Sequence, residues 1–403
     1  MLKGNLLIGQ SGGPTPVINA SLAGVLSEAK KADFINKIYG MKQGISGLLN
    51  KEVIDLTNEP QDIIDKMLYT PASILGSCRH KLKTEDEYDK ILSIFIENDI
   101  KYFVYIGGND SMDTCYKIAQ LAERKNYEMK VIGCPKTIDN DLPFTDHTPG
   151  FGSAAKFIAL TTVETGRDQE SMKTFEDIAI YEIMGRNAGW LTAASALLKK
   201  SELDAPHLIY LPEVTFDEDK FIEDVKSIYD KFGYAAISVS EGIVNKDGEI
   251  IGTENAEVDD FGHKIISTAM GPGNYLAQLV SKKLGLKARC NRPGIIQRSS
   301  ASLASEIDVA EAFECGKKTI EYFAKGISGV MVTMDRTEGE EYLIEYGMKE
   351  LGKVANVEHC VPKHFINKDK NFITDAFIRY CAPLIGKDLK EYARLTGKAL
   401  LLK

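Results

Sequence analysis

Two carboxylates, a threonine and a lysine stand close together in residues 133–142, which read GCPKTIDNDL. A carboxylate beside a hydroxyl can take its proton as phosphoryl transfer proceeds, and a second carboxylate can orient the first or help to hold Mg²⁺. Asp139 and Asp141 are therefore candidates for these two roles, with Lys136 beside them as a cation. The same residues would also suit an exposed acidic turn that binds nothing.

Two glycine-rich segments are candidates for binding phosphate: residues 9–16 (GQSGGPTP) and residues 105–111 (YIGGNDS). Glycines let backbone N–H groups approach a phosphate closely, and the N-terminus of a following helix adds a favourable dipole. Neither segment is a G-x-G-x-x-G fingerprint or a Walker A loop, and the sequence has no G-K-[ST] triplet. Unliganded strand-to-helix turns would also fit, with Ser111 as the cap of the second helix.

A fourth polar segment, residues 182–190 (EIMGRNAGW), leaves a predicted strand and carries Arg186. An arginine at the end of a strand is a suitable ligand for a sugar phosphate, because its guanidinium makes charge-assisted hydrogen bonds. A solvated arginine in a helix-starting turn is the alternative.

Short apolar runs alternate with helical stretches and would place these segments at the edge of a sheet. Continuous apolar strands that alternate with helices indicate a parallel sheet covered on both faces. In open α/β sheets, ligands lie at the carboxyl ends of the strands, where the polar segments fall. A first set of strands is predicted at residues 5–9, 35–39, 102–106 and 131–134, and a second set, which forms another α/β unit, at residues 178–183, 208–211 and 235–239.

The composition is that of a soluble globular protein, with 44% hydrophobic and 27% charged residues. The net charge of −9 argues against nucleic acid or an anionic membrane as the partner, so an anionic substrate would need a local set of cations. No run approaches about 18 apolar residues, so we expect no membrane span. Scattered cysteines and the lack of a signal peptide predict a cytoplasmic protein with reduced thiols.

Taken in order, these four segments resemble the phosphofructokinase family. The resemblance spans residues 5–335, and the string PKTIDND at residues 135–141 is highly specific to that family. It implies an α/β protein with the phosphofructokinase fold, in which two Rossmann-like α/β domains enclose the active site in the cleft between them. We expect a donor-binding domain at residues 1–152 and 298–345, a fructose 6-phosphate-binding domain at residues 153–297, and a C-terminal extension at residues 346–403 packed on the body.

The resemblance also implies a role for each site residue. Asp139 matches the general base that accepts the proton of the sugar 1-hydroxyl, and Arg79 matches the arginine that bridges donor and acceptor. Lys136 matches a cation beside the departing phosphate, and Mg²⁺ is the implied cofactor. The implied donor-binding residues are Gly12, Gly13, Gly108, Asp110 and Ser111; the implied fructose 6-phosphate-binding residues are Thr137, Asp141, Met184, Gly185, Arg186, Glu241, Arg289 and Arg298; and the implied metal ligands are Asn109, Asp110, Asp139 and Asp141.

Asp110 and Lys136 together predict inorganic pyrophosphate rather than ATP as the phosphoryl donor. ATP-using relatives carry a glycine at the position that matches Asp110, where the α-phosphate and ribose of the nucleotide pass close to the backbone. A carboxylate there fills the space, and two like charges ~4 Å apart at an effective dielectric of ~20 repel by ~4 kcal/mol. Some ATP-using relatives also have a lysine at the position of Lys136, so the prediction of pyrophosphate depends on Asp110 and Lys136 together.

The implied reaction is reversible and converts fructose 6-phosphate and pyrophosphate to fructose 1,6-bisphosphate and phosphate. The alternatives are an ATP-dependent phosphofructokinase and a catalytically silent, sugar-phosphate-binding regulatory subunit. Three positions depart from the family pattern: Asn109 replaces an aspartate, Ile295 replaces a histidine, and Asp177 replaces an arginine that a neighbouring subunit contributes. The last two departures weaken the case for a 6-phosphate site shared between subunits. Because relatives are dimers or tetramers, we still expect a homodimer or homotetramer.

Overall fold

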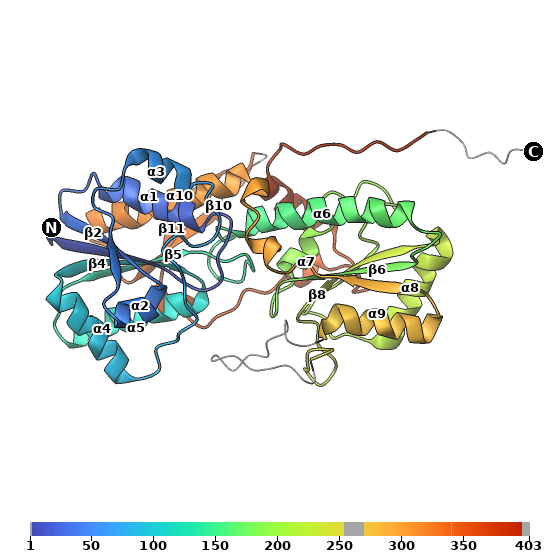
Figure 1. The fold of residues 1–403 in the computed structure, drawn as a ribbon, viewed down its shortest axis with the longest axis horizontal. Helices are drawn as coiled ribbons and strands as arrows, with labels where there is room; N and C mark the ends of the chain where they lie inside the picture. The colour runs from blue at the N-terminus through green and yellow to red at the C-terminus, as the bar shows by residue number, and fades with distance from the viewer. Residues whose placement is uncertain (1, 254–269, 340, 397–403) are drawn as a thin grey trace, which may run out of the picture.

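The computed structural model describes residues 2–253, 270–339 and 341–396, and it consists of two α/β lobes that lie side by side (Figure 1). The first lobe holds a seven-stranded sheet in the order β11-β10-β5-β4-β1-β2-β3, and the second holds a four-stranded sheet in the order β7-β8-β6-β9. The strands are β1 (Gly4–Gln10), β2 (Ile35–Met41), β3 (Val53–Asp55), β4 (Ile100–Gly107), β5 (Lys130–Pro135), β6 (Ile178–Ile183), β7 (Leu208–Tyr210), β8 (Ala235–Ser240), β9 (Ala288–Asn291), β10 (Val330–Arg336) and β11 (Ile344–Glu350). The expected α/β fold with two units is confirmed.

The first sheet is parallel from β10 to β2, and the antiparallel strands β3 and β11 form its two edges. Its central strands β1 and β4 are buried along nearly their whole length, as apolar runs covered on both faces should be. Figure 1 shows α1, α3 and α10 on one face and α2, α4 and α5 on the other. These helices are α1 (Ile18–Ala29), α2 (Gly44–Leu49), α3 (Gln61–Met67), α4 (Glu85–Glu97), α5 (Asn109–Arg124) and α10 (Glu306–Ala324).

The second sheet is parallel throughout, with β9 as an edge strand that the sequence did not predict. In Figure 1, α6 and α7 cover one face and α8 and α9 cover the other. The helices of this lobe are α6 (Phe151–Ser171), α7 (Trp190–Ala194), α8 (Glu218–Phe232) and α9 (Gly271–Leu284), with the short 3₁₀ helices η2 (Gly294–Arg298) and η3 (Ala301–Leu303) leading back to the first lobe. Within the described residues, no helix is long and apolar enough to cross a membrane.

The chain passes between the lobes at places that matter for the site. It first crosses after β5, through residues 136–142, which we call the carboxylate loop. At the start of the α6 helix that follows, the Gly150 and Ser153 N–H groups donate to the Asp308 carboxylate of α10, each at 2.8 Å. The lobes are thereby joined directly behind the carboxylate loop.

The last crossing follows β11, which pairs with β10 in the first sheet. From there α11 (Leu351–Val354), η4 (Lys363–Phe365), α12 (Asp375–Cys381) and η5 (Ala382–Ile385) lead to the second lobe, whose core includes Phe365 and Phe377. The domain ranges stay a proposal, but the strand β11 places the start of the extension after residue 350 rather than at 346. Those ranges also include residues 1, 254–269, 340 and 397–403, which lie outside the described residues.

Candidate active site

The carboxylate loop turns at Asn140, whose φ of 55° lies in the left-handed region that asparagine tolerates better than most residues. The side chain of Asn140 fixes this turn. Its Oδ1 accepts from the Thr148 N–H at 3.0 Å, and its Nδ2 donates to the Tyr380 hydroxyl at 3.1 Å. Asn140 is thereby buried, while Asp139 and Asp141 on either side of it stay partly exposed.

Charged groups from both lobes surround Asp139. Burial raises the pKa of Asp139, while the neighbouring cations Lys136, Arg186 and Arg298 oppose the shift. Glu241 follows β8, and burial together with the charge of Asp139 raises the pKa of Glu241 to about 7. The arrangement gathers a carboxylate of raised basicity and cations from separate elements, which suits proton transfer beside a phosphate.

Asp141 is the second carboxylate of the loop. Burial and the charge of Asp139 raise the pKa of Asp141 to about 7, and Glu358 adds to the shift. Burial also lowers the pKa of Lys136 to about 8, although both aspartates oppose this change. Two carboxylates whose charges disfavour each other form a site at which a bound cation would relieve the repulsion.

The first glycine segment lies against the cations. Lys136 Nζ donates to the Gly13 carbonyl at 2.8 Å. A Cβ atom at Gly13 would lie 2.5 Å from Arg298 Nη1, so a larger residue would displace that guanidinium. Gly12 has a φ of 73°, which favours glycine, and its backbone lies beside the Lys136 ammonium group. This segment therefore presents its backbone to two cations, as a phosphate-binding loop would.

The loop that carries Arg79 is tied to the same segment, because Ser77 Oγ donates to the Gly12 carbonyl at 2.7 Å. Burial, and then the charge of Arg79, lower the pKa of Arg298. Two guanidinium groups held near one another repel, and a phosphate dianion between them would convert that repulsion into charge-assisted hydrogen bonds.

The second glycine segment joins β4 to α5. The Lys136 N–H donates to the Gly107 carbonyl at 3.0 Å, which brings this segment beside the carboxylate loop. A Cβ atom at Gly107 would lie 2.0 Å from Ser111 Oγ, so glycine allows α5 to start directly at the strand end. Gly108 is the N-cap of α5; the alternative in which Ser111 caps the helix is wrong, because Ser111 is buried inside the first turn.

Asp110 lies in the first turn of α5 and forms an ion pair with Lys81, with 3.0 Å between Asp110 Oδ1 and Lys81 Nζ. The two side chains are 55% and 35% exposed, respectively. The pair links the loop that carries Arg79 to α5. Because the Asp110 carboxylate is held in this ion pair with Lys81, we do not propose it as a metal ligand.

The sugar side of the site is built from the ends of β6 and β8. The Met184 N–H donates to Gln297 Oε1 at 3.0 Å, and the Gly185 N–H approaches Glu241 Oε1 at 3.5 Å. Arg186 Nε is buried, and within the described chain it has no hydrogen-bond partner. An acidic group and a guanidinium with unused hydrogen-bonding capacity are suited to sugar hydroxyls and a sugar phosphate.

The structure adds a feature that the sequence did not predict: residues 355–361, the C-terminal strap, pass from the first lobe to the second beside the carboxylate loop (Figure 1). The His359 N–H donates to the Asp141 carbonyl at 2.8 Å. The His359 carbonyl accepts from Trp190 Nε1, also at 2.8 Å. The sequence of the strap, ANVEHCV, has no glycine or charge pattern that marks a site.

Asn109 is bound to this strap by both ends of its side-chain amide. Its Nδ2 donates to the Val357 carbonyl at 2.6 Å, and its Oδ1 accepts from the Asn356 N–H at 2.9 Å. The prediction that Asn109 is a metal ligand is therefore dropped, because its amide holds backbone.

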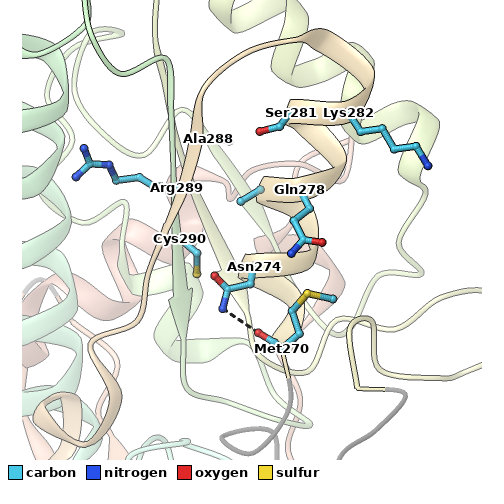
Figure 2. A pocket seen from close by; sticks show the side chains of 9 residues that line it. Met270, Asn274, Gln278, Ser281, Lys282, Ala288, Arg289 and Cys290 are labelled. Atoms are coloured by element: carbon cyan, nitrogen blue, oxygen red, sulfur yellow. Dashed lines mark hydrogen bonds between the residues drawn. The ribbon is translucent and has the colours of Figure 1, made fainter.

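Arg289 is not brought into the cluster. It lies on β9 opposite Ala179, near the start of β6, whereas the site is at the opposite end of that strand. Its guanidinium pairs with Glu176. Figure 2 shows Arg289 extending away from the α9 side chains beside it, at a groove of ≈ 720 Å³ between α9 and β9. Within one copy of the chain, Arg186 and Arg298 are the arginines whose charges act on Asp139.

Comparison with known proteins identifies the family. The phosphofructokinase family profile matches residues 5–323. The chain is 40% identical over 417 residues to a pyrophosphate–fructose 6-phosphate 1-phosphotransferase from Xanthomonas campestris pv. campestris, covering 100% of this chain and 99% of the relative. A protein of the same name from Halomonas elongata is 39% identical over 399 residues, or 97% and 94% of the two chains. The chain belongs to the phosphofructokinase family.

The solved structures agree with this assignment to the phosphofructokinase family. The crystal structure of a pyrophosphate-dependent phosphofructokinase from Nitrosospira multiformis has a TM-score of 0.86 and 39% sequence identity, and covers 97% of this chain and 94% of that one. The phosphofructokinase fold expected from the sequence is thereby confirmed. The roles of single residues stay predictions, and the structure brings most of the expected residues together: Gly12, Gly13, Arg79, Gly108, Ser111, Lys136, Thr137, Asp139, Asp141, Met184, Gly185, Arg186, Glu241 and Arg298.

The residues of this phosphofructokinase-family site fit Mg²⁺ in part. Asp139 and Asp141 supply hard oxygen ligands, and the charge of Asp139 raises the pKa of Asp141, an effect that a divalent cation would oppose. Among the described residues, no group of three or more His, Cys, Asp or Glu side chains is placed to hold an ion. The two aspartates therefore suit an ion that keeps water and substrate phosphates as its other ligands.

Proposed function

We propose that this phosphofructokinase-family protein reversibly transfers a phosphoryl group from inorganic pyrophosphate to the 1-hydroxyl of fructose 6-phosphate. The observation that carries the proposal is the position of Asp139 among Lys136, Arg186 and Arg298, which come from both sides of the lobe junction. The name of the full-length relative at 40% identity supports the same reaction.

Asp139 is the proposed general base. Its pKa is raised by burial, which favours acceptance of the proton from the 1-hydroxyl. Thr137 fixes the backbone beneath this carboxylate, because the Asp139 N–H donates to Thr137 Oγ1 at 3.0 Å. In the reverse direction the protonated carboxyl returns its proton to the leaving sugar oxygen.

The cations stabilise the charge on the phosphates. Arg298 lies beside Gly13 and Arg79 lies near Arg298, where the two guanidinium groups would hold the group being transferred. Lys136 is buried with its ammonium on the Gly13 carbonyl, and its lowered pKa of about 8 reflects the cost of that burial. A bound phosphate anion would offset the cost of burying the Lys136 charge, and the lysine would stabilise the phosphate. The protein therefore contributes to the reaction by positioning the reactants and by neutralising their charge.

Mg²⁺ is the proposed cofactor, held by Asp139 and Asp141 together with phosphate oxygens. When bound, the ion neutralises part of the negative charge on pyrophosphate. The protein's own contribution is to keep the two carboxylates close to Lys136, so that the site accepts a metal-bound anion as a unit.

Asp110 is the proposed barrier to ATP, and its ion pair with Lys81 refines the physical reason. Because Lys81 offsets the charge of Asp110, a nucleotide phosphate would meet less repulsion than a lone carboxylate exerts. The two paired side chains instead occupy the room beside the first turn of α5. We therefore propose that exclusion of ATP is mainly spatial.

We also propose that the protein is a cytoplasmic homodimer or homotetramer. The edge strand β9 lies close to three large apolar side chains, Phe175, Ile295 and Ile296, which are 62%, 65% and 56% exposed. Exposed apolar side chains beside a strand that forms a sheet edge, as β9 does among the described residues, favour association with a second copy. Arg289 lies on this strand, so a neighbouring copy would meet it there.

The donor comparison tests the proposal. Initial rates are measured with fructose 6-phosphate and Mg²⁺ plus either pyrophosphate or ATP, and in reverse with fructose 1,6-bisphosphate and phosphate. We expect turnover with pyrophosphate to exceed that with ATP by at least ~100-fold, the ratio that ~2.7 kcal/mol of discrimination supplies. A faster rate with ATP would identify an ATP-dependent phosphofructokinase, and fructose 6-phosphate binding without turnover would identify a regulatory subunit.

A further inference from the structure

The C-terminal strap lies beyond residues 5–323, which match the family, yet it contacts three of the segments that form the site. At one end it binds the start of α5, which follows the second glycine segment. In the middle it binds the carboxylate loop through His359 and Asp141. At the other end it binds the loop between β6 and α7, which carries the sugar-side residues. A single short segment therefore connects the donor, carboxylate and sugar parts of the site.

The attachment to α5 depends on an amide rather than an acid at residue 109. Asn109 donates to the Val357 carbonyl at 2.6 Å and accepts from the Asn356 N–H at 2.9 Å. A carboxylate could still accept from Asn356, but it has no proton to donate and would place an anionic oxygen against the Val357 carbonyl. The Asn356 side chain adds a bond to Asp113 Oδ1 at 3.2 Å, which also lies on α5.

The attachment to the second lobe is also polar and specific. Glu358 Oε1 accepts from Asn187 Nδ2 at 2.6 Å, and the Val361 N–H donates to the Glu213 carboxylate at 2.8 Å. The same Glu213 oxygen accepts from the Gly189 N–H at 2.9 Å. Because Glu213 binds the strap and the β6–α7 loop with one atom, movement of the strap would move the sugar side of the site.

We infer that Asn109 is a positioning residue, which anchors the C-terminal strap and so holds the carboxylate loop in register with the donor and sugar loops. The inference rests on the proposed function, since it states what the strap does for that reaction. Its physical basis is that the Asp141 carbonyl is held by the strap while Asn140 is held by Thr148 and Tyr380. Release of the strap removes one of these supports, and a small displacement of reacting groups is enough to slow phosphoryl transfer strongly.

The decisive variant is Asn109→Asp, because a metal-ligand role and an anchor role predict opposite results. If Asn109 bound Mg²⁺, an aspartate would be the better ligand, and the Mg²⁺ concentration for half-maximal activity would fall while turnover was kept. If Asn109 anchors the strap, we expect kcat to fall by at least ~10-fold with smaller changes in KM for both substrates. The matched control is Asn58→Asp, which adds the same charge at an exposed turn of the same lobe.

Two probes inside the protein report on the strap without any turnover. Cys360 is the exposed cysteine of the described chain, but its Sγ still lies 3.7 Å from the Asn187 carbonyl, so its alkylation rate should rise at least ~3-fold when the strap is released. Trp190 is the only tryptophan, and its ring lies against His359 with 5.1 Å between centroids. Its fluorescence emission should therefore shift in Asn109→Asp and stay unchanged in Asn58→Asp.

A second variant, Glu358→Ala, removes the bond between the strap and Asn187 on the sugar side and leaves both α5 and the Val361–Glu213 bond in place. We expect it to reproduce the faster Cys360 alkylation and the lower kcat, which keeps the inference testable if Asn109→Asp does not fold. Unchanged Cys360 and Trp190 signals in both variants, or full turnover with a lower Mg²⁺ requirement in Asn109→Asp, would overturn the inference. Failure of the proposed function would be a separate result. The wild type would then lack pyrophosphate-dependent turnover, but Cys360 alkylation and Trp190 fluorescence would still show whether each variant releases the strap.

Discussion

The two sides of the carboxylate loop satisfy their charges in opposite ways. On the side that faces the glycine segments, which we call the reactive side, burial raises the pKa of Asp139 and lowers the pKa of Lys136. Burial therefore disfavours the charged form of each group. On the far side, His147 is 1% exposed and lies between Asp146 Oδ2 at 2.9 Å and Glu311 Oε2 at 2.8 Å. The first side is arranged to receive charge from outside the protein, whereas the second neutralises its charges internally.

The internally paired side supports the reactive one. Tyr380 donates its hydroxyl proton to the Asp146 carbonyl at 2.7 Å and accepts from Asn140 Nδ2. Arg336 binds the Asp146 carboxylate at 2.9 Å, and its guanidinium lies 4.8 Å from the Tyr380 ring centroid. The left-handed turn at Asn140 is therefore held by groups whose own charges are satisfied. Rigidity and reactivity are divided between the two sides of one loop.

Asp139→Asn should give the largest effect on activity and separate the two sides most clearly. We expect kcat to fall by about 10³, because the base is lost while the cations and the turn remain. The thermal midpoint should not fall. The pKa of Asp139 is higher in the folded protein than its ordinary value, so ionisation at neutral pH opposes folding, and the neutral amide removes that opposition. Steady-state rates and thermal unfolding measure both results; a near-full rate would refute the base assignment.

Lys136→Met should give a smaller loss of activity from the same side. We expect kcat to fall by about 10², which is typical for loss of one group that stabilises charge in the transition state. Stability should be kept, because the lowered pKa of about 8 shows that burial disfavours the charged ammonium. Steady-state kinetics distinguish the roles: a higher KM for pyrophosphate with unchanged kcat would mean that Lys136 binds the donor but does not assist transfer.

His147→Gln should have the opposite profile, with a large loss of stability and a smaller loss of activity. Burial lowers the pKa of His147, but the bonds to Asp146 and Glu311 outweigh it and raise the pKa to about 9. Removing one partner from a buried ionic group costs about 3–5 kcal/mol. The exposed His364→Gln is the matched control. Chemical denaturation measures the free energy of unfolding, and equal stability of both variants would contradict the pairing.

The same histidine sets a pH dependence of stability in the wild type. Its folded pKa of about 9 lies above the ordinary value of 6.5, so the stabilisation is fully present below about pH 6.5 and is lost as the pH rises through about 9. We expect the difference in free energy of unfolding between wild type and His147→Gln to be large at pH 6 and to shrink by pH 9.5. A constant difference over this range would mean that His147 is neutral in the folded protein.

The reactive side of the loop could be predicted from the sequence, and the supporting side could not. Asp139, Asp141 and Lys136 are neighbours in one short string, so their proximity follows from covalent connection. The His147–Glu311 pair joins residues 164 positions apart, on different elements, and nothing local in the sequence relates them. Long-range pairing of this kind depends on the tertiary fold.

The same reason accounts for the missed elements. The edge strands β3 and β9 are short and not buried, so their sequences show little of the apolar pattern that marks a strand. The C-terminal strap has no regular structure, and its role depends on Asn109, far away in the sequence. Arg289 was expected in the sugar-phosphate site from the family pattern alone, and its position on an edge strand is visible only once the sheet order is known.

Asp110→Gly should give the smallest effect, because Asp110 belongs to neither side of the carboxylate loop. Its ion pair with Lys81 is exposed and is worth at most about 1 kcal/mol, so stability should change little beyond the cost of a glycine in the first turn of α5. Pyrophosphate turnover should stay within about threefold of wild type, since no group near Asp139 is altered. ATP-dependent turnover, measured with the same coupled assay, should become detectable because space opens and Lys81 loses the carboxylate that neutralised it.

The double variant Asp110→Gly with Lys81→Ala separates space from charge in this prediction. If room alone excludes ATP, the double variant should use ATP as well as the single one or better. If the released Lys81 ammonium attracts the nucleotide, ATP turnover should fall when Lys81 is also removed. Should neither variant use ATP, the barrier lies with the buried Lys136 and not with the exposed pair, and donor choice would then belong to the reactive side of the carboxylate loop.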